Sequence, residues 1–216
     1  TETFLTEGFK SLGLSGGNKG QFIQTVPLVA IESKVTSGLN IQSLPLTLGQ
    51  DYVAVSRQTS EHIRLKDSEL VFVGYGINAP EYGWNDYAEI DVKGKTVVML
   101  VNDPGYATQD PELFNGKSMT YYGRWTYKYE EAARQGAAAA IIVHETAPAS
   151  YGWTVVENSW TGEKFSLPRS EKSEPIVDVE MWLSEQGTRQ IFSQSGLDFD
   201  ELKMAAQKPG FKAVSL

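Results

Sequence analysis

The side chains that most often hold catalytic metals are scarce in this sequence. It contains two histidines, His62 and His144, and no cysteine. A hydrolytic zinc centre needs several His and carboxylate ligands, often in motifs such as H-E-x-x-H, and no such motif occurs. The lack of cysteine also excludes disulfides, zinc fingers, iron–sulfur clusters and thiol nucleophiles. We therefore expect no catalytic residue, no bound metal and no other cofactor in this chain.

Two apolar segments, residues 95–101 and 138–143, are predicted to form neighbouring strands, and polar residues follow each of them. The helical pattern between them predicts a β-α-β unit, whose two strands are parallel and end at the same edge of the sheet. Ligands of open parallel sheets bind at that edge, where the N-terminus of the intervening helix also points. The residues expected to converge on this rim are Asn102, Asp103, Tyr121, Tyr122, Arg124, Trp125, His144 and Glu145.

This rim is a candidate surface for binding a substrate or partner, because Tyr, Trp and Arg combine contact area with directional polar groups. Packing of loop aromatics explains the same aromatic residues equally well. His144 is not assigned to a serine triad, because no G-x-S-x-G motif supplies a nucleophile. The loop after the first strand lacks the D-x-[DN]-x-[DN]-G order of a calcium loop, so we interpret its acidic and amide side chains as solvated: Asp103, Asp110, Glu112 and Asn115.

Residues 74–79 (GYGINA) match the G-x-G-x-x-A pattern of dinucleotide-binding folds. In those folds a helix begins directly after the glycines and receives the pyrophosphate at its N-terminus. Pro80 and Gly83 prevent such a helix here. We predict that the match marks a turn.

The 216 residues, 41% of them hydrophobic, can bury the core of one sizeable domain with or without appendages. The net charge of −8 excludes a surface for nucleic acid or anionic membrane, since both require a positive patch. No stretch approaches the roughly 20 apolar residues of a membrane span, so no membrane insertion is expected. No leader segment precedes the first element, so we expect any export signal to have been removed.

The patterns along the chain predict a mixed α/β, β-rich fold with one β-α-β unit and short peripheral helices. A helix is expected at the start of the chain, and no partner is evident for its apolar face. This face consists of Phe4, Leu5, Phe9 and Leu12. The other elements expected are strands within residues 39–55, 70–73, 95–101, 138–143 and 176–183, a helix over residues 125–136 and two short helices near the end, the second capped by Asp198.

Two segments resemble a known family: VFVGYGINAPEYGWNDYAEIDVKGKTVVMLVNDPGY, residues 71–106, and MTYYGRWTYKYEEAARQGAAAAIIVHETAP, residues 119–148. They are similar to the protease-associated (PA) domain of peptidase family twenty-eight, the two-zinc aminopeptidases. The resemblance implies a PA-domain fold of the swivelling β/β/α type over residues 40–208. It also implies that residues 1–39 resemble the start of a peptidase domain and that residues 209–216 lead back to it.

The family implies a periplasmic or extracellular parent enzyme whose zinc ligands follow the inserted domain, outside this chain. The inserted domain would then be non-catalytic, with its own peptidase domain and a peptide or protein substrate as partners. It would cover the active-site cleft and contribute to substrate access, selection or protein–protein interaction. Two other hypotheses about function stay open. The first is a free-standing module that binds peptide or carbohydrate, suggested by five Trp and ten Tyr residues. The second is a self-sufficient hydrolase.

Overall fold

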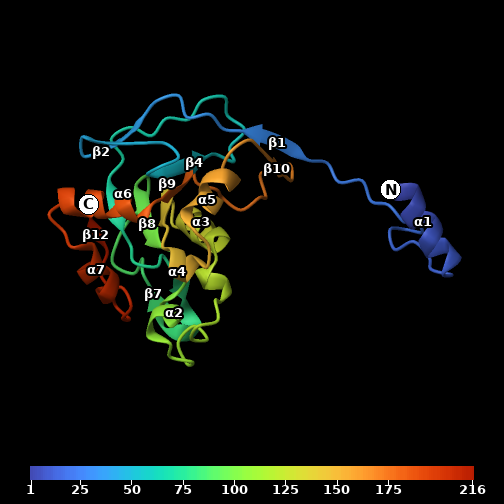
Figure 1. Cartoon of the computed structure of the whole chain (residues 1–216). Helices are drawn as coiled ribbons and strands as arrows, with labels where there is room; N and C mark the ends of the chain where they lie inside the picture. Colours follow the sequence, from blue (N-terminus) through green and yellow to red (C-terminus); the bar gives the residue numbers. More distant parts are fainter.

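A six-stranded sheet forms the centre of the computed structural model, which describes residues 1–216 (Figure 1). The strand order is β12-β5-β8-β9-β11-β4, and the four inner strands are parallel. The two outer strands, β4 and β12, run antiparallel to their neighbours. The strands are β4 (Tyr52–Val55), β5 (Leu70–Phe72), β8 (Thr96–Leu100), β9 (Ala139–Val143), β11 (Val179–Leu183) and β12 (Val214–Ser215). The predicted mixed α/β, β-rich fold is confirmed.

The predicted β-α-β unit lies in the middle of this sheet. Strands β8 and β9 pair in parallel from Thr96 opposite Ala139 to Leu100 opposite Val143, and α3 (Trp125–Arg134) connects them. All ten residues of the two strands are buried. Their continuous apolar sequences follow from this position, because both faces of a central parallel strand are covered.

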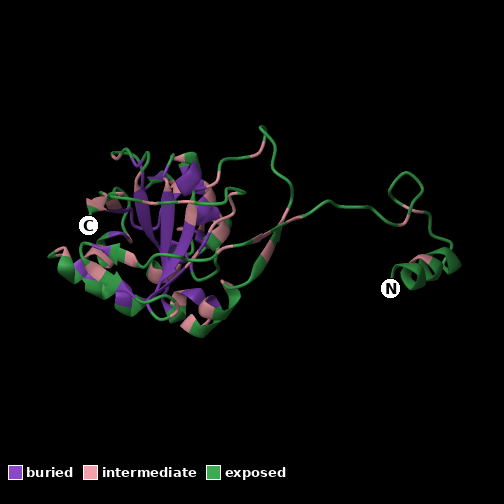
Figure 2. Ribbon diagram, turned by 90° about the horizontal axis from the view of Figure 1, so that it is seen from above, coloured by how far each residue is buried: buried purple, intermediate pink, exposed green.

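Helices cover both faces of the sheet and divide the core into two layers. Residues of α6 (Glu185–Gln194) and α7 (Phe199–Ala205) pack with Phe72 and Leu100 on one face. Residues of α3 and α5 (Trp153–Ser159) pack with Met99 and Ile142 on the other face. Consecutive strand residues alternate between the two layers, as the pleat of a strand requires, and Figure 2 shows the buried residues gathered along this sheet.

Short elements fill the connections, and the structure corrects the sequence expectation for two of them. Residues 102–124 contain α2 (Pro104–Thr108) and the 3-10 turn η2 (Tyr121–Gly123). The segment after Pro148, for which the sequence patterns predict no element before residue 176, forms α5 and β10 (Glu163–Ser166), and α4 (Thr146–Ala149) precedes them. Helical elements of three to seven residues are too short to show a helical period. Other short elements are β2 (Leu39–Ile41), β3 (Leu44–Leu46), β6 (Asn78–Ala79), η1 (Pro80–Tyr82) and β7 (Trp84–Asn85).

The glycine motif at residues 74–79 forms a turn, as predicted. It leads into β6 and η1, and no α-helix begins there. Gly76 has φ of 64°, and a Cβ at this position would lie 2.4 Å from the Met99 sulfur. Only glycine fits, because both the backbone conformation and the packing exclude a side chain.

The N-terminal arm, residues 1–28, extends away from the sheet domain (Figures 1 and 2). Its helix α1 (Glu2–Ser11) confirms the predicted helix but has no buried residue. The arm joins the rest of the molecule through β1 (Val29–Glu32), which pairs with β10 as a two-stranded antiparallel ribbon. The apolar face of α1 is therefore exposed. None of the helices has the length and apolar character needed to cross a bilayer.

Candidate functional site

A cavity of about 500 Å³ lies at the carboxyl ends of the parallel strands. We call it the rim cavity. This is the position at which open parallel sheets bind ligands. Its polar wall comes from the residues that follow β5, β8, β9 and β11 and from α7, and it includes Tyr75, Asn102, Asp103, Glu145, Glu185 and Lys203.

Asn102 joins the ends of the two central strands. Its backbone has φ of 68°, a left-handed conformation that asparagine adopts more readily than most residues. The Asn102 Nδ2 donates to the Pro148 carbonyl over 2.9 Å, and Asn102 Oδ1 accepts from the Asp103 amide over 2.8 Å. The amide side chain thus holds the segment after β8 against the segment after β9.

Asp103 is completely buried beside it. Its Oδ2 accepts from the amide and the hydroxyl of Thr120, over 3.0 and 2.7 Å. Its Oδ1 has no hydrogen-bond partner in the protein. The acidic loop was interpreted as solvated from its sequence, and this is wrong for Asp103, because the Thr120 bonds hold its carboxylate inside the domain.

A buried ammonium lies behind this wall, on α3. Lys128 has no exposed surface, and its Nζ donates to the Tyr75 carbonyl over 2.5 Å. Burial lowers the pKa of Lys128, while Asp86 and Asp103 attract its charge and oppose that shift. Burial likewise raises the pKa of Asp86, although this carboxylate accepts from the Ile77 amide and the Trp84 indole. The sequence does not indicate that Lys128 is buried, because a lysine among charged residues of a helix is normally expected to be exposed to solvent.

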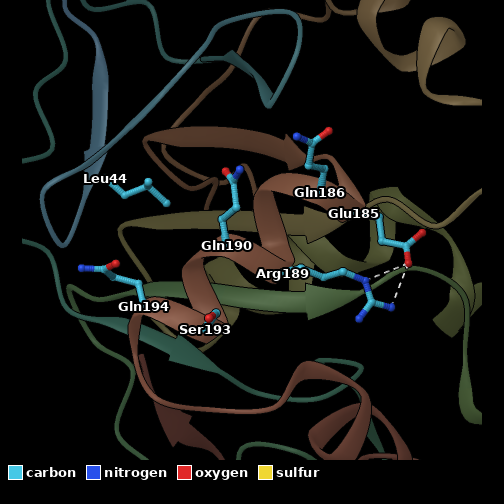
Figure 3. Close-up of a pocket in the computed structure, with 7 residues that line it drawn as sticks. All are labelled: Leu44, Glu185, Gln186, Arg189, Gln190, Ser193 and Gln194. Atoms are coloured by element: carbon cyan, nitrogen blue, oxygen red, sulfur yellow. Dashed lines mark hydrogen bonds and ion pairs between the residues drawn. The ribbon is translucent and has the colours of Figure 1, made fainter.

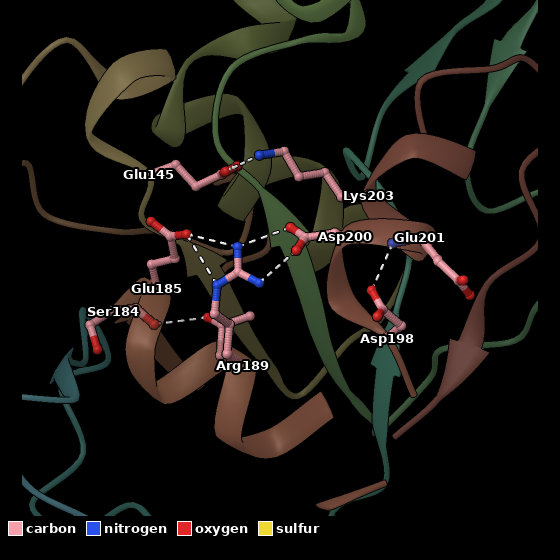
Figure 4. A network of polar contacts seen from close by, with 9 residues as sticks. Glu145, Ser184, Glu185, Arg189, Asp198, Asp200, Glu201 and Lys203 are labelled. Atoms are coloured by element: carbon pink, nitrogen blue, oxygen red, sulfur yellow. Dashed lines mark hydrogen bonds and ion pairs between the residues drawn. The ribbon is translucent and has the colours of Figure 1, made fainter. Parts of the chain in front are cut away.

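Glu145 closes the other side of the rim cavity. Its carboxylate forms an ion pair with Lys203 of α7, and the two side chains are 9% and 29% exposed (Figure 4). Below this pair, Arg189 bridges Glu185 at 3.0 Å and Asp200 at 2.8 Å. These charges tie α6, α7 and the rim together. Sequence reasoning found Glu145 but missed the four charged residues of α6 and α7 in this network, because they are distant from Glu145 in sequence.

His144 follows the same strand but lies in a different environment. Its ring is buried near Trp153 and Trp182, and its Nε2 is 3.0 Å from the Tyr151 carbonyl. Burial lowers the pKa of His144. His62 is exposed and lies outside any strand. No three His, Cys, Asp or Glu side chains are grouped so that they could hold a metal ion.

The two tyrosines of η2 are held by carboxylates. The Tyr122 hydroxyl donates to Glu81 over 2.6 Å, and this bond raises the pKa of Tyr122 to about 12. Its ring packs edge-on against Tyr127 at 4.9 Å. The Tyr121 hydroxyl donates to Glu130 over 2.7 Å, and its side chain is 54% exposed. Tyr122 therefore packs the loop, while Tyr121 stays available at the surface.

Arg124 and Trp125 face outward at the start of α3. Arg124 is exposed. The ring of Trp125 lies 6.1 Å from that of Trp160 and 5.9 Å from the Arg57 guanidinium. Trp125 also lines a second cavity of about 530 Å³ with the exposed Phe165 of β10. We call this cavity the aromatic groove.

The eight predicted residues therefore divide among four settings. Asn102, Asp103 and Glu145 meet in the rim cavity. His144 belongs to a buried aromatic cluster, and Trp125 belongs to the aromatic groove. The remaining residues lie in or next to η2, where Tyr121 and Arg124 are exposed and Tyr122 is half-buried.

A further hollow of about 830 Å³ lies on the outer face of α6 (Figure 3). Leu44 forms its apolar side, and amide side chains of the helix dominate the rest, among them Gln186, Gln190 and Gln194. The Glu185–Arg189 ion pair lies at its edge. Its uncharged amides offer hydrogen bonds, and Ser193 is the other uncharged polar residue of the lining.

Comparison with known proteins gives one structural likeness. No protein-family model and no curated protein matches the chain. Among solved structures, an aminopeptidase from Aneurinibacillus sp. strain AM-1 matches over 91% of this chain and 35% of its own, with 16% identity and a TM-score of 0.38. The chain thus spans about a third of the length of that aminopeptidase.

Proposed function

We propose that the chain is the non-catalytic PA domain of a periplasmic or extracellular zinc aminopeptidase, with a PA-domain fold of the swivelling β/β/α type over residues 40–208. In this proposal it covers the cleft of its own peptidase domain and contributes to substrate access, selection or protein–protein interaction. Zinc would be held by that peptidase domain and not by this chain. The sequence resemblance of residues 71–106 and 119–148 supports this proposal.

The observation that carries the proposal is the exposed apolar face of α1. Phe4, Leu5, Phe9 and Leu12 are 79%, 49%, 44% and 75% exposed. A ten-residue helix is marginal in water unless its apolar face packs against another surface. The sheet domain does not supply that surface, because α1 lies apart from it (Figure 1). A peptidase domain flanking the insertion would do so.

The surface around the start of α3 is the proposed contact with substrate. Tyr121, Arg124 and Trp125 present an exposed tyrosine, a cation and an indole on neighbouring positions. Such residues dominate binding energy at protein interfaces. Peptides long enough to reach from a peptidase cleft to this surface would be affected by it, and short ones would not.

The test compares cleavage of short and long peptides by the intact parent enzyme with Arg124→Ala or Trp125→Ala. We expect the ratio of kcat/KM for long over short peptides to change about tenfold or more, equivalent to about 1.4 kcal/mol. Arg64→Ala and Met204→Ala are the controls, because both residues are exposed away from α3. Unchanged selectivity in both test variants would remove this surface from the proposal.

The aromatic groove favours a second candidate function, a free-standing module for peptide or carbohydrate. Trp125, Trp160 and Phe165 expose ring surface there or pack directly behind it. Sugar rings and extended peptides both bind concave aromatic surfaces. A glycan array and a peptide screen on this chain would support this candidate if one ligand class bound and Trp125→Ala abolished the binding.

A further inference from the structure

The rim cavity carries more negative than positive charge. Asp103, Glu145 and Glu185 line it, and Lys203 is its single basic lining residue. Lys203 enters from α7 and places its ammonium on Glu145. A primary ammonium on a flexible stem therefore already fits this wall of the cavity.

An independent feature of the same cavity is the free oxygen of Asp103. The Asp103 side chain is fully buried, Thr120 satisfies its Oδ2, and its Oδ1 has no donor. A buried acceptor without a partner costs free energy that a donor would recover. The Lys128 ammonium attracts this carboxylate from behind but donates to the Tyr75 carbonyl instead. A ligand with N–H groups could supply the missing donor.

The chemistry of the wall selects the kind of ligand. A primary ammonium has three donors and no acceptor, which matches a wall whose charged acceptors are carboxylates. An anion would be repelled by the same three carboxylates. A metal ion is not favoured, because no three ligating side chains are grouped suitably.

We propose that the rim cavity binds the primary ammonium of a peptide, with the carboxylates of Asp103 and Glu145 as its acceptors. The ammonium belongs either to a peptide N-terminus or to a lysine side chain. This inference rests on the proposed role in handling peptides and assigns that role a ligand group. The resident Lys203 ammonium competes with the ligand for Glu145.

Binding is tested by nuclear magnetic resonance titration of the 216-residue chain with three short peptide amides. The first has a free N-terminus and no lysine, the second is N-acetylated and contains one lysine, and the third is N-acetylated without lysine. We expect the first, the second or both to shift the resonances of the rim cavity, and the third to shift none. Equal binding of all three, or binding of none, would overturn the proposal.

Variants locate the binding to these residues. Asp103→Asn and Glu145→Gln should each weaken binding about tenfold or more, since a hydrogen bond to a charged group is lost. Lys203→Met should tighten binding because it removes the competing ammonium. Asp110→Asn and Lys208→Met, exposed changes in the same loop and helix region, should change nothing.

If Asp103→Asn fails to fold, the other two variants still test the proposal. Glu145→Gln should bind the peptide more weakly than the native chain, and Lys203→Met should bind it more tightly. Weaker or unchanged binding in Lys203→Met would contradict the proposed competition. Failure of the proposed access role would appear only in the selectivity of the parent enzyme. The binding measurement on this chain is independent of that outcome.

Discussion

At the residue scale, the environment of a side chain decides its role more than its type does. Asn102, Asp103 and Glu145 were predicted at the rim from the order of the strands, and the structure brings them into one cavity. His144 was predicted with them but points into the aromatic core. A strand pattern fixes which residue follows the strand, but not the direction in which its side chain leaves the rim.

The buried imidazole of His144 predicts an acid-sensitive step in stability. Its pKa is lowered by burial, so the folded state favours the neutral ring. The stability it contributes is present above the unfolded pKa of about 6.5 and is lost as the pH falls through that value toward the folded pKa. Urea unfolding from pH 7 to 5 should show this loss in the native chain and a smaller one in His144→Gln. Parallel pH profiles would contradict the assignment.

Gly123 lies where the segment before α3 packs closely against the residues of the rim. A Cβ there would lie 2.8 Å from Met119 Cγ and 3.0 Å from the nearest oxygens of Asn102 and Asp103. Gly123→Ala should therefore lower the free energy of unfolding by about 1–3 kcal/mol, the usual cost of overpacking. Gly38→Ala is the control, because its Cβ would meet no atom within 4 Å. Equal denaturation midpoints for the two variants would show that the residues around Gly123 can move to accommodate a Cβ, which would contradict this prediction.

At the element scale, long apolar patterns were predictable and short elements were not. Strands β8 and β9 and helix α3 show clear patterns because the sheet buries both faces of its central strands. Helices α4 and α5 were missed because tertiary contacts hold them. One such contact is the bond from the Trp153 indole to the Gly49 carbonyl, 2.7 Å long and 104 residues apart.

The N-cap of α7 should contribute to the stability of this helix, which lines one side of the rim cavity. The Asp198 carboxylate accepts from the Glu201 amide over 3.0 Å, as its sequence pattern predicted. Asp198→Ala should cost about 1 kcal/mol of unfolding free energy, whereas Asp198→Asn should retain most of it because asparagine caps equally well. Thermal unfolding of both variants measures the difference. An equal loss in both would mean that charge, not the cap bond, stabilises α7.

At the scale of the whole molecule, the sheet domain and the N-terminal arm differ in how much they bury. The sheet domain has a two-layered core, while α1 has no buried residue. Sequence reasoning predicted the helix and its missing partner from Phe4, Leu5, Phe9 and Leu12. It could not predict the position of the arm, because an apolar helical pattern shows which face of the helix packs but not the surface against which it packs.

The arm contributes little to the sheet domain in this account. Its bonds are internal, such as those between Asn18 and Gln21, and its Phe9 ring packs with Phe22. Removing residues 1–28 should therefore leave the thermal midpoint of the remaining chain nearly unchanged. A large fall in that midpoint would show that the arm packs on the sheet domain in solution.

Hydrogen exchange of α1 tests the central claim most directly. The amides of α1 should exchange rapidly in the 216-residue chain, because a short helix without a partner opens readily. In the intact parent enzyme the same amides should be strongly protected, because the peptidase domain would cover Phe4, Leu5, Phe9 and Leu12. Equally rapid exchange of these amides in both proteins would contradict the proposal that this chain is the accessory domain of a larger peptidase.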